Sequence, residues 1–308
     1  MPIILPERET NLYDTLKASG AAVIYEREAL RQDIYPARIG LLNLMPAAAM
    51  ARSESHWLRA ISDSVLQVEP IFIKFDDDPR ARSGSSRRTI LGRYQPFSTA
   101  TRRGLHGLII TGDNLELRGD SSQRKLLPFE EIFYAHQLAQ VIDWARQNVY
   151  TTIYSCLASH FALHYLYGLE RQIAGQKIFG IFEHAVQEDS DFTHHMNDTM
   201  YAPHSRWGDI AVGALTRAGL QILATSKDVG WLLAQGTNEA GGQDLFIQGH
   251  PEYGRYDLAD EYKRDQTLGI APPQDYFRAG RPCLTWITDA QVLYSNWIKA
   301  IYNSWPTD

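Results

Sequence analysis

The chain alternates apolar runs of strand length with segments that have the periodicity of helices. Apolar runs lie at residues 37–46, 68–75, 104–114 and 149–155, and amphipathic patterns such as 129–148 separate them. Strands this continuously apolar are buried on both faces, as in parallel sheets that helices cover from both sides. The sequence therefore predicts an α/β fold with a mostly parallel sheet between two layers of helices.

The second half of the chain adds a different pattern. Four more apolar runs follow with mostly turn residues between them, at 177–186, 219–227, 229–235 and 244–250. Strands joined by short turns pair antiparallel, so we expect added antiparallel strands. Helical patterns at 256–269 and 287–305 close the chain.

The organisation of the chain is simple. It has 308 residues and shows neither an internal repeat nor a low-complexity linker, so we expect a single domain over 1–308. A polar stretch at about 76–100 is expected to be a surface excursion from that domain.

The composition excludes several classes of protein. The formal net charge is −6 and the arginines are scattered, whereas a nucleic-acid surface needs a concentrated basic face. No segment approaches the roughly 20 apolar residues of a membrane span, and the start turns acidic too soon for a signal peptide. Two cysteines make no disulfide framework, and no spacing matches a zinc site. We expect a cytoplasmic protein without a metal, a membrane or a nucleic-acid partner.

Cys156 lies where the apolar run 149–155 ends and a helical pattern begins. In parallel α/β sheets, ligands bind at the carboxyl ends of the strands, and a helix N-terminus favours an anion such as a thiolate. The N–H of Leu157 is placed to stabilise an oxyanion, much as in the nucleophile elbow of hydrolases. The alternative is a buried structural cysteine. Cys283 has no such setting, and we interpret it as structural.

A candidate base follows the last apolar run. His250 comes directly after it, and Glu252 is two residues further, on the same side of an extended segment. Glu252 could fix the tautomer of His250 and stabilise its imidazolium. Together with Cys156 they would form a nucleophilic triad.

Six motifs along the chain resemble those of the MetA-type homoserine O-acyltransferases, in the same order. They are "LLNLMP" at 41–46, "LIITG" at 108–112, the strand–Cys156–helix elbow, "YAPHSR" at 201–206, "GHPEY" at 249–253 and "KRD" at 263–265. The resemblance covers almost the whole chain. It implies a flavodoxin-like fold of the class I glutamine-amidotransferase type.

The resemblance also implies roles for individual residues. Cys156 would be the acyl-thioester nucleophile, His250 the proton acceptor and Glu252 its partner. Three further positions match substrate-contacting residues, namely Lys177, Ser205 and Arg264, the last of these binding the carboxylate of the amino acid. The reaction would be ping-pong, with acyl-CoA as co-substrate, no cofactor, and a homodimer as the expected assembly.

Glu116, in "TGDNLEL", matches the position that in this family goes with the choice of acyl donor. Glutamate there goes with acetyl transfer and glycine with succinyl transfer. A carboxylate in the acyl pocket would repel the free carboxylate of a succinyl group, so acetyl-CoA is favoured. The alternative is that Glu116 is a solvated loop charge.

The sequence departs from the family pattern in two loops. Ala47 stands where members carry a lysine after "NLMP", and Asp113 and Asn114 replace the usual "AP". Arg52, reached by a different loop path, is a candidate substitute for the lysine. Such changes leave L-serine or a related hydroxy amino acid as an alternative acceptor, because one methylene is worth only about 1–3 kcal/mol in an apolar pocket. Succinyl-CoA as donor, a glutamine amidotransferase-like hydrolase and a non-catalytic module also stay open.

Overall fold

The computed structural model describes all residues except 1, 65, 83–86, 119–123, 188–189 and 306–308. Over the described residues the main sheet has twelve strands, in the order β11-β10-β12-β13-β14-β9-β6-β3-β4-β1-β2, with β5 beside β4. The neighbouring pairs from β14 to β2 are parallel, as is β4 with β5. These strands are β1 (Ile3–Leu5), β2 (Val23–Tyr25), β3 (Ala37–Leu42), β4 (Val68–Lys74), β5 (Gln95–Pro96), β6 (Gly107–Ile110), β9 (Thr151–Ser155) and β14 (Gln243–Ile247). The predicted parallel sheet is confirmed.

The other end of the sheet is antiparallel, as expected from the short turns. Its strands are β10 (Gln172–Val186), β11 (Thr199–Asp209), β12 (Gln221–Ser226) and β13 (Gly230–Thr237). Strand β11 was not among the expected strands. It pairs with β10 over most of its length and forms the outer edge of the sheet.

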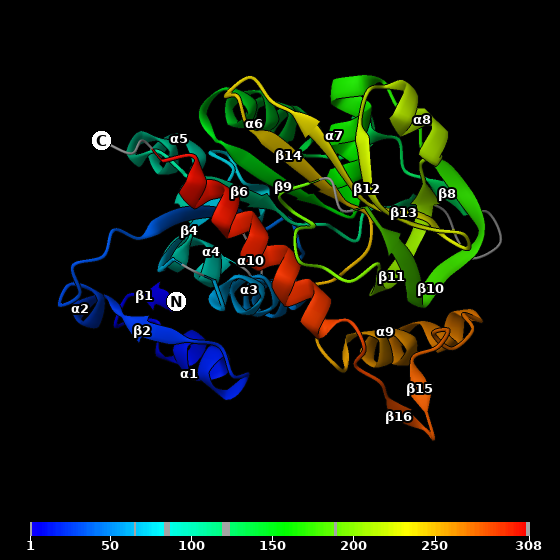
Figure 1. The fold of residues 1–308 in the computed structure, drawn as a ribbon, viewed down its shortest axis with the longest axis horizontal. Coiled ribbons are helices and arrows are strands. Elements are labelled where there is room, and N and C mark those ends of the chain that lie inside the picture. Colours follow the sequence, from blue (N-terminus) through cyan, green and yellow to red (C-terminus); the bar gives the residue numbers. More distant parts are fainter. Residues whose placement is uncertain (1, 65, 83–86, 119–123, 188–189, 306–308) are drawn as a thin grey trace.

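Helices cover both faces of the sheet (Figure 1). One layer consists of α1 (Thr10–Ala18), α3 (Ala47–Ser62) and α10 (Ile287–Asn303), and the other contains α6 (Ala135–Asn148), α7 (Leu157–Tyr167) and α8 (Val212–Arg217). Successive strand residues supply the two cores, because side chains alternate across a strand. Leu41 belongs to the first core and Leu42 to the second.

Helix α10 lies so close to the sheet that only glycine fits beneath it. A Cβ on Gly107 would stand 2.6 Å from Ile301 and 2.9 Å from Trp297. Tyr294 and Trp297 are fully buried in the core, whereas Tyr302 is half exposed. The aromatic side chains in the middle of this last helix therefore pack in the hydrophobic core.

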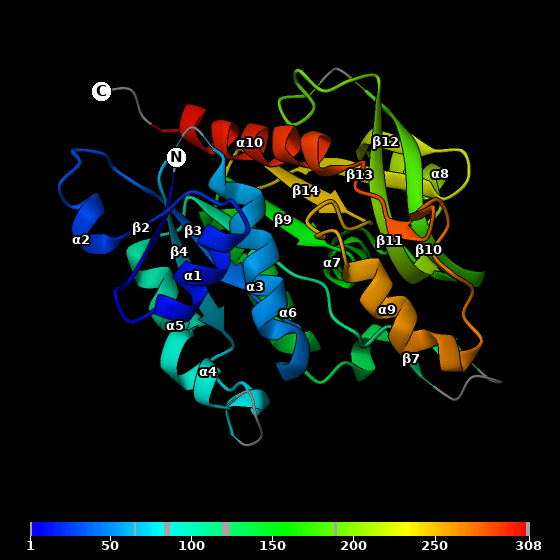
Figure 2. The ribbon, with the colours of Figure 1, turned by 90° about the horizontal axis from the view of Figure 1, so that it is seen from below.

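The remaining elements are short or lie near the site. They are α2 (Glu26–Ala29), α4 (Arg87–Arg93), α5 (Phe97–Ala100), α9 (Asp257–Asp265), the 3-10 turns at 79–81, 101–103, 129–131 and 266–268, and the paired strands β7 (Leu117–Arg118) with β8 (Lys125–Leu126) and β15 (Phe277–Arg278) with β16 (Arg281–Pro282). Helix α9 lies beside the ends of β10 and β11 (Figure 2). In the part of the chain that the structure describes, no helix has both the length and the apolar character needed to cross a membrane.

The segment at 76–100 is more than a surface excursion. It contains α4, β5 and α5, and Ile90 and Tyr94 are buried. Residues 83–86, within its most polar part, lie outside the described residues. The stretch after "NLMP" also differs from the expected loop, because helix α3 begins at Ala47, directly after Pro46.

Candidate active site

Cys156 occupies the turn between β9 and α7, as its place in the sequence predicted. Its backbone has φ 50° and ψ −113°, a conformation that residues with a side chain rarely adopt and that concentrates at functional sites. Gly112 leaves room for it, since a Cβ there would stand 3.1 Å from the Cβ of Cys156. The thiol is partly exposed and lines a pocket, so Cys156 is not a buried structural residue.

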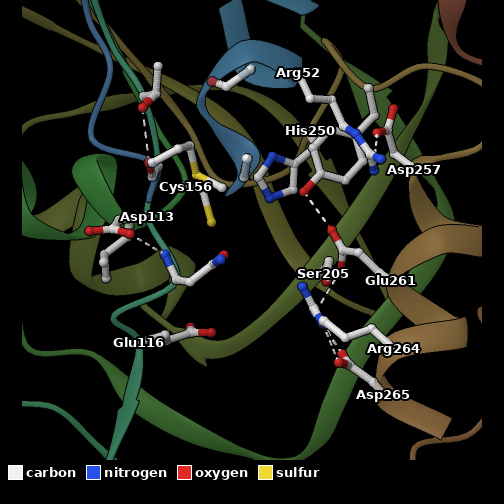
Figure 3. Close-up of a pocket in the computed structure, with 18 of the residues that line it drawn as sticks. Arg52, Asp113, Glu116, Cys156, Ser205, His250, Asp257, Glu261, Arg264 and Asp265 are labelled. Carbon is white, nitrogen blue, oxygen red and sulfur yellow. Dashed lines mark hydrogen bonds and ion pairs between the residues drawn. The ribbon is translucent and has the colours of Figure 1, made fainter. Parts of the chain in front are cut away.

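His250 lies beside Cys156 (Figure 3), and Glu252 supports the imidazole from its other side. Nδ1 of His250 is 2.8 Å from Oε1 of Glu252, and both residues are buried. Burial alone would lower the pKa of His250, but the negative charges of Cys156 and Glu252 and hydrogen bonds to both outweigh it. The pKa of His250 is therefore well above its usual value, which favours the imidazolium.

The pocket around these residues has a volume of about 490 Å³, in the range of small-molecule sites. Its walls come from the loops after β3 and β6, from the starts of α3 and α7, from β10 and β11, and from α9. Most of these loops follow the carboxyl ends of parallel strands. The site therefore lies where an α/β sheet binds its ligands.

Lys177, Ser205 and Arg264 meet on one side of the pocket, on β10, β11 and α9. Lys177 Nζ is 2.9 Å from Asp265 Oδ2 and 3.5 Å from Glu261 Oε2. The hydroxyl of Ser205 donates to the same Oε2 of Glu261. We call this group of five residues, Lys177, Ser205, Glu261, Arg264 and Asp265, the acceptor cluster.

The guanidinium of Arg264 is paired within the acceptor cluster. Its Nε and Nη2 donate to the two carboxylate oxygens of Asp265, at 2.5 and 2.9 Å. Burial alone would raise the pKa of Asp265, but hydrogen bonds from Arg264 and Lys177 and their charges lower it to about 2. A substrate carboxylate that bound Arg264 would have to share or displace this pairing.

Sequence reasoning missed Glu261 and Asp265. They and Arg264 follow the spacing i, i+3 and i+4 on α9, which places them on one face of that helix. That spacing is the signal that could have indicated them. The spacing does not show which strands this face of α9 packs against.

Glu116 lies on the opposite side of the pocket from the acceptor cluster (Figure 3). Its Oε2 accepts from the backbone N–H of Trp207 at 2.8 Å, and its Oε1 from that of Gly208 at 2.5 Å. The alternative of a solvated loop charge is wrong, because both oxygens are fixed against β11. Arg124 covers the indole of Trp207, with its guanidinium 4.5 Å from the ring centre.

The residues in the two departing loops have partners of their own. Arg52 lines the pocket, but its Nη1 is 3.0 Å from Asp260 Oδ2 and 3.6 Å from Asp257 Oδ1. Asp113 accepts from the hydroxyl of Tyr134 at 2.7 Å, and burial raises its pKa. The charge of Arg52 is thus engaged by α9, which weakens it as a substitute for the missing lysine.

The segment at 76–100 braces the loop that follows β3. Arg80 Nη1 donates to the carbonyl oxygens of Asn43 and Met45, both at 2.9 Å, and Asp78 holds the same guanidinium. Tyr94 accepts from the side chain of Asn43 and donates to the buried Glu54. Because Met45 lines the pocket, this segment supports one of its walls.

Comparisons with known proteins identify the family of the chain. The family model described as homoserine O-succinyltransferase matches residues 2–307. A homoserine O-acetyltransferase of Thermotoga petrophila is 34% identical over 314 residues, covering 99% of this chain and 98% of its own. A homoserine O-succinyltransferase of Shewanella amazonensis is 33% identical over 325 residues, covering 100% of this chain and 95% of its own.

A solved structure shares the fold at low sequence identity. It is a putative GMP synthase subunit from Thermoplasma acidophilum, with a TM-score of 0.50 and 11% identity, covering 87% of this chain and 96% of that one. The expected class I glutamine-amidotransferase-like fold is confirmed. At this identity the likeness concerns the fold alone.

Proposed function

The chain belongs to the homoserine O-succinyltransferase family of acyltransferase enzymes, and on this premise we propose that it transfers an acetyl group from acetyl-CoA to the hydroxyl of L-homoserine. The observation that carries the proposal is the contact of thiol, imidazole and carboxylate in one pocket. Family membership supports an acyl group and a homoserine acceptor. The route through Cys156 and the choice of acetyl-CoA rest on the chemistry of the pocket residues.

In the first half-reaction the thiolate of Cys156 attacks the thioester carbonyl of acetyl-CoA. A new C–S bond forms, and the carbonyl oxygen becomes an oxyanion facing the N–H of Leu157. As the first residue of α7, Leu157 has no acceptor within its own helix, so its N–H is available. The bond to the CoA sulfur then breaks, and the imidazolium of His250 gives its proton to the departing CoA thiolate.

In the second half-reaction neutral His250 takes the proton of the acceptor hydroxyl. The hydroxyl oxygen attacks the acetyl–Cys156 thioester, and the C–S bond to Cys156 breaks. Thiolate and imidazolium are then restored. Glu252 holds Nδ1 of His250 at 2.8 Å, which leaves Nε2 for both proton transfers.

The acceptor cluster suits a zwitterionic amino acid, because both signs of charge lie side by side there. Arg264 and Lys177 provide cations for a carboxylate, and Glu261 provides an anion for an ammonium group. L-Serine carries the same two charged groups on a shorter chain. Its discrimination from homoserine therefore depends on the distance from the cluster to Cys156.

The fixed position of Glu116 supports the choice of acetyl over succinyl transfer. Two backbone N–H groups hold its carboxylate, so moving it away from an incoming succinyl group would break both hydrogen bonds. The carboxylate would also repel that of the succinyl group. The smaller, uncharged acetyl group meets neither obstacle.

A panel of two donors and two acceptors tests the proposal. Acetyl-CoA and succinyl-CoA are each supplied with L-homoserine or L-serine, and release of CoA and the acylated product are measured. The proposal predicts turnover with acetyl-CoA and homoserine that Cys156→Ala abolishes. Equal rates with both donors would remove the role given to Glu116, and release of glutamate from glutamine would favour an amidotransferase-like hydrolase.

A further inference from the structure

Tyr253 is the pocket residue with the closest ring contact to the imidazole of His250. The two rings are stacked with centres 4.2 Å apart and planes 16° apart. The backbone of Tyr253 is fixed on both sides, because its N–H donates to the His250 carbonyl and its carbonyl accepts from Trp286 Nε1 at 3.0 Å. The phenol ring is therefore a rigid wall against one face of the imidazole.

The hydroxyl of Tyr253 reaches the acceptor cluster. It donates to Oε1 of Glu261 at 2.7 Å, while Oε2 of the same carboxylate faces Ser205 and Lys177. The side chain of Tyr253 thus touches both the imidazole of His250 and Glu261, one of the two anions of the acceptor cluster.

We propose that Tyr253 is a positioning residue with two separable roles: its ring holds the imidazole of His250 and favours the imidazolium, and its hydroxyl aims Glu261 at the acceptor. The inference rests on the proposed function and deepens it. An imidazolium is attracted to the electron-rich face of an aromatic ring. A carboxylate that keeps one hydrogen bond to a fixed phenol stays oriented when the acceptor enters or leaves.

Several other charged or titratable groups surround the imidazole or its immediate supports. Cys156 at the start of α7, His204 on β11 and Glu252 act on the imidazole itself. On α3, Arg59 donates to the carbonyl of Glu252, and the ring of His56 contacts that of Tyr253. None of these groups changes in a Tyr253 variant. A shift of the pH profile that appears in Tyr253→Leu and not in Tyr253→Phe can therefore be assigned to loss of the ring.

Two substitutions separate the roles. Tyr253→Phe keeps the ring and removes the hydroxyl, whereas Tyr253→Leu removes both. Tyr256→Phe and Tyr256→Leu serve as matched controls, because Tyr256 lies three residues further along and is 64% exposed. Acylation of Cys156 by acetyl-CoA is followed in single turnovers without acceptor, and KM for homoserine is measured in steady state.

For Tyr253→Phe we expect acylation at the unaltered rate. KM for homoserine should rise roughly tenfold to a hundredfold, the effect of losing a hydrogen bond to a charged group. For Tyr253→Leu we expect the same rise in KM together with slower acylation. The alkaline limb of its acylation profile should move to lower pH by about half to one and a half units, since the imidazolium loses its aromatic partner.

Two results would overturn the inference. One is that both Tyr253 variants behave like the Tyr256 controls while the unaltered enzyme forms acetyl–Cys156. The other is that Phe and Leu slow acylation equally with no movement of the pH profile, which is the signature of a merely structural residue. If Tyr253→Leu does not fold, Tyr253→Phe alone tests the inference: the acylation rate should be unaltered and the KM for homoserine raised. Failure of the unaltered enzyme to form acyl–Cys156 would instead refute the proposed function.

Discussion

Replacing Glu252 by glutamine tests how the imidazole of His250 is activated. Glutamine keeps the size of the side chain and removes the negative charge that lies 2.8 Å from Nδ1 of His250. His250 is 7% exposed and Glu252 5%, so water can replace little of the lost interaction. Breaking a buried charge pair costs about 3–5 kcal/mol, which at about 1.4 kcal/mol per factor of ten predicts a loss of about 10²- to 4 × 10³-fold in kcat/KM.

The same substitution has a defined effect on pH dependence. Because the charges of Cys156 and Glu252 raise the pKa of His250, removing one of them lowers that pKa. The imidazolium that protonates the departing CoA is then lost at a lower pH, so the alkaline limb of the acylation profile moves down.

The assay is the release of CoA from acetyl-CoA over a range of pH, with the melting temperature measured alongside. Glu239→Gln is the control, because the side chain of Glu239 is 60% exposed and belongs to no wall of the pocket. If Glu252→Gln matches the control in both rate and pH profile, activation of His250 by the Glu252 charge is refuted.

Three further predictions concern donor choice and stability. Glu116→Gly should turn over succinyl-CoA in the donor panel, because the N–H groups of Trp207 and Gly208 become free for the succinyl carboxylate; an unchanged donor preference would contradict this. Burial lowers the pKa of His160 to about 3, so as pH falls below about 6.5 the imidazole is protonated in the unfolded chain before it is protonated in the folded one. The free energy of unfolding measured in urea titrations should therefore fall by up to about 1.4 kcal/mol per pH unit. His160→Gln should reduce this slope. Gly242→Ala should lose more than about 4 kcal/mol of stability in the same titrations, because the new Cβ would stand 1.8 Å from the carbonyl oxygen of residue 150. Gly175→Ala is the control: its Cβ would meet no atom within 4 Å, so this variant should fold normally.

The parallel half of the fold was predictable because its strands depend on local pattern. A strand buried on both faces must be apolar at every position, as in Leu41 and Leu42, which enter opposite cores. The turn at Cys156 was predictable for the same reason, since the change from strand to helix pattern marks it. These features need no knowledge of distant partners.

Strand β11 could not be predicted this way, because it buries a charged side chain whose stability depends on its hydrogen-bond acceptors. Arg206 is 1% exposed, and its guanidinium donates to the carbonyls of Gly208 and Val229 and to Asp209. A buried arginine is stable only when such acceptors surround it. The sequence alone does not show that they do.

The loop after "NLMP" was misinterpreted for a different reason. Pro46 followed by Ala47, Ala48 and Ala49 is a good local signal for a helix start. The expectation of a loop rested on the family pattern, which has a lysine in place of Ala47. Local propensity was the better guide, since α3 begins at Ala47.

The acceptor cluster was only partly predictable from the sequence. Lys177, Ser205 and Arg264 were expected to contact the substrate, and the structure brings them together. Glu261 and the Tyr253 hydroxyl that holds it were not expected, because their contact depends on how α9 is docked against β10 and β11. Side-chain partners of this kind follow from tertiary packing.

Intact-mass measurement of the enzyme after mixing with each donor, before any acceptor is added, tests the central claim most directly. The account predicts that acetyl-CoA adds one acetyl group, that peptide mapping locates it on Cys156, that Cys156→Ala adds none, and that homoserine removes it. An enzyme that makes O-acetylhomoserine while Cys156 stays unmodified, or whose Cys156→Ala variant turns over normally, would contradict it.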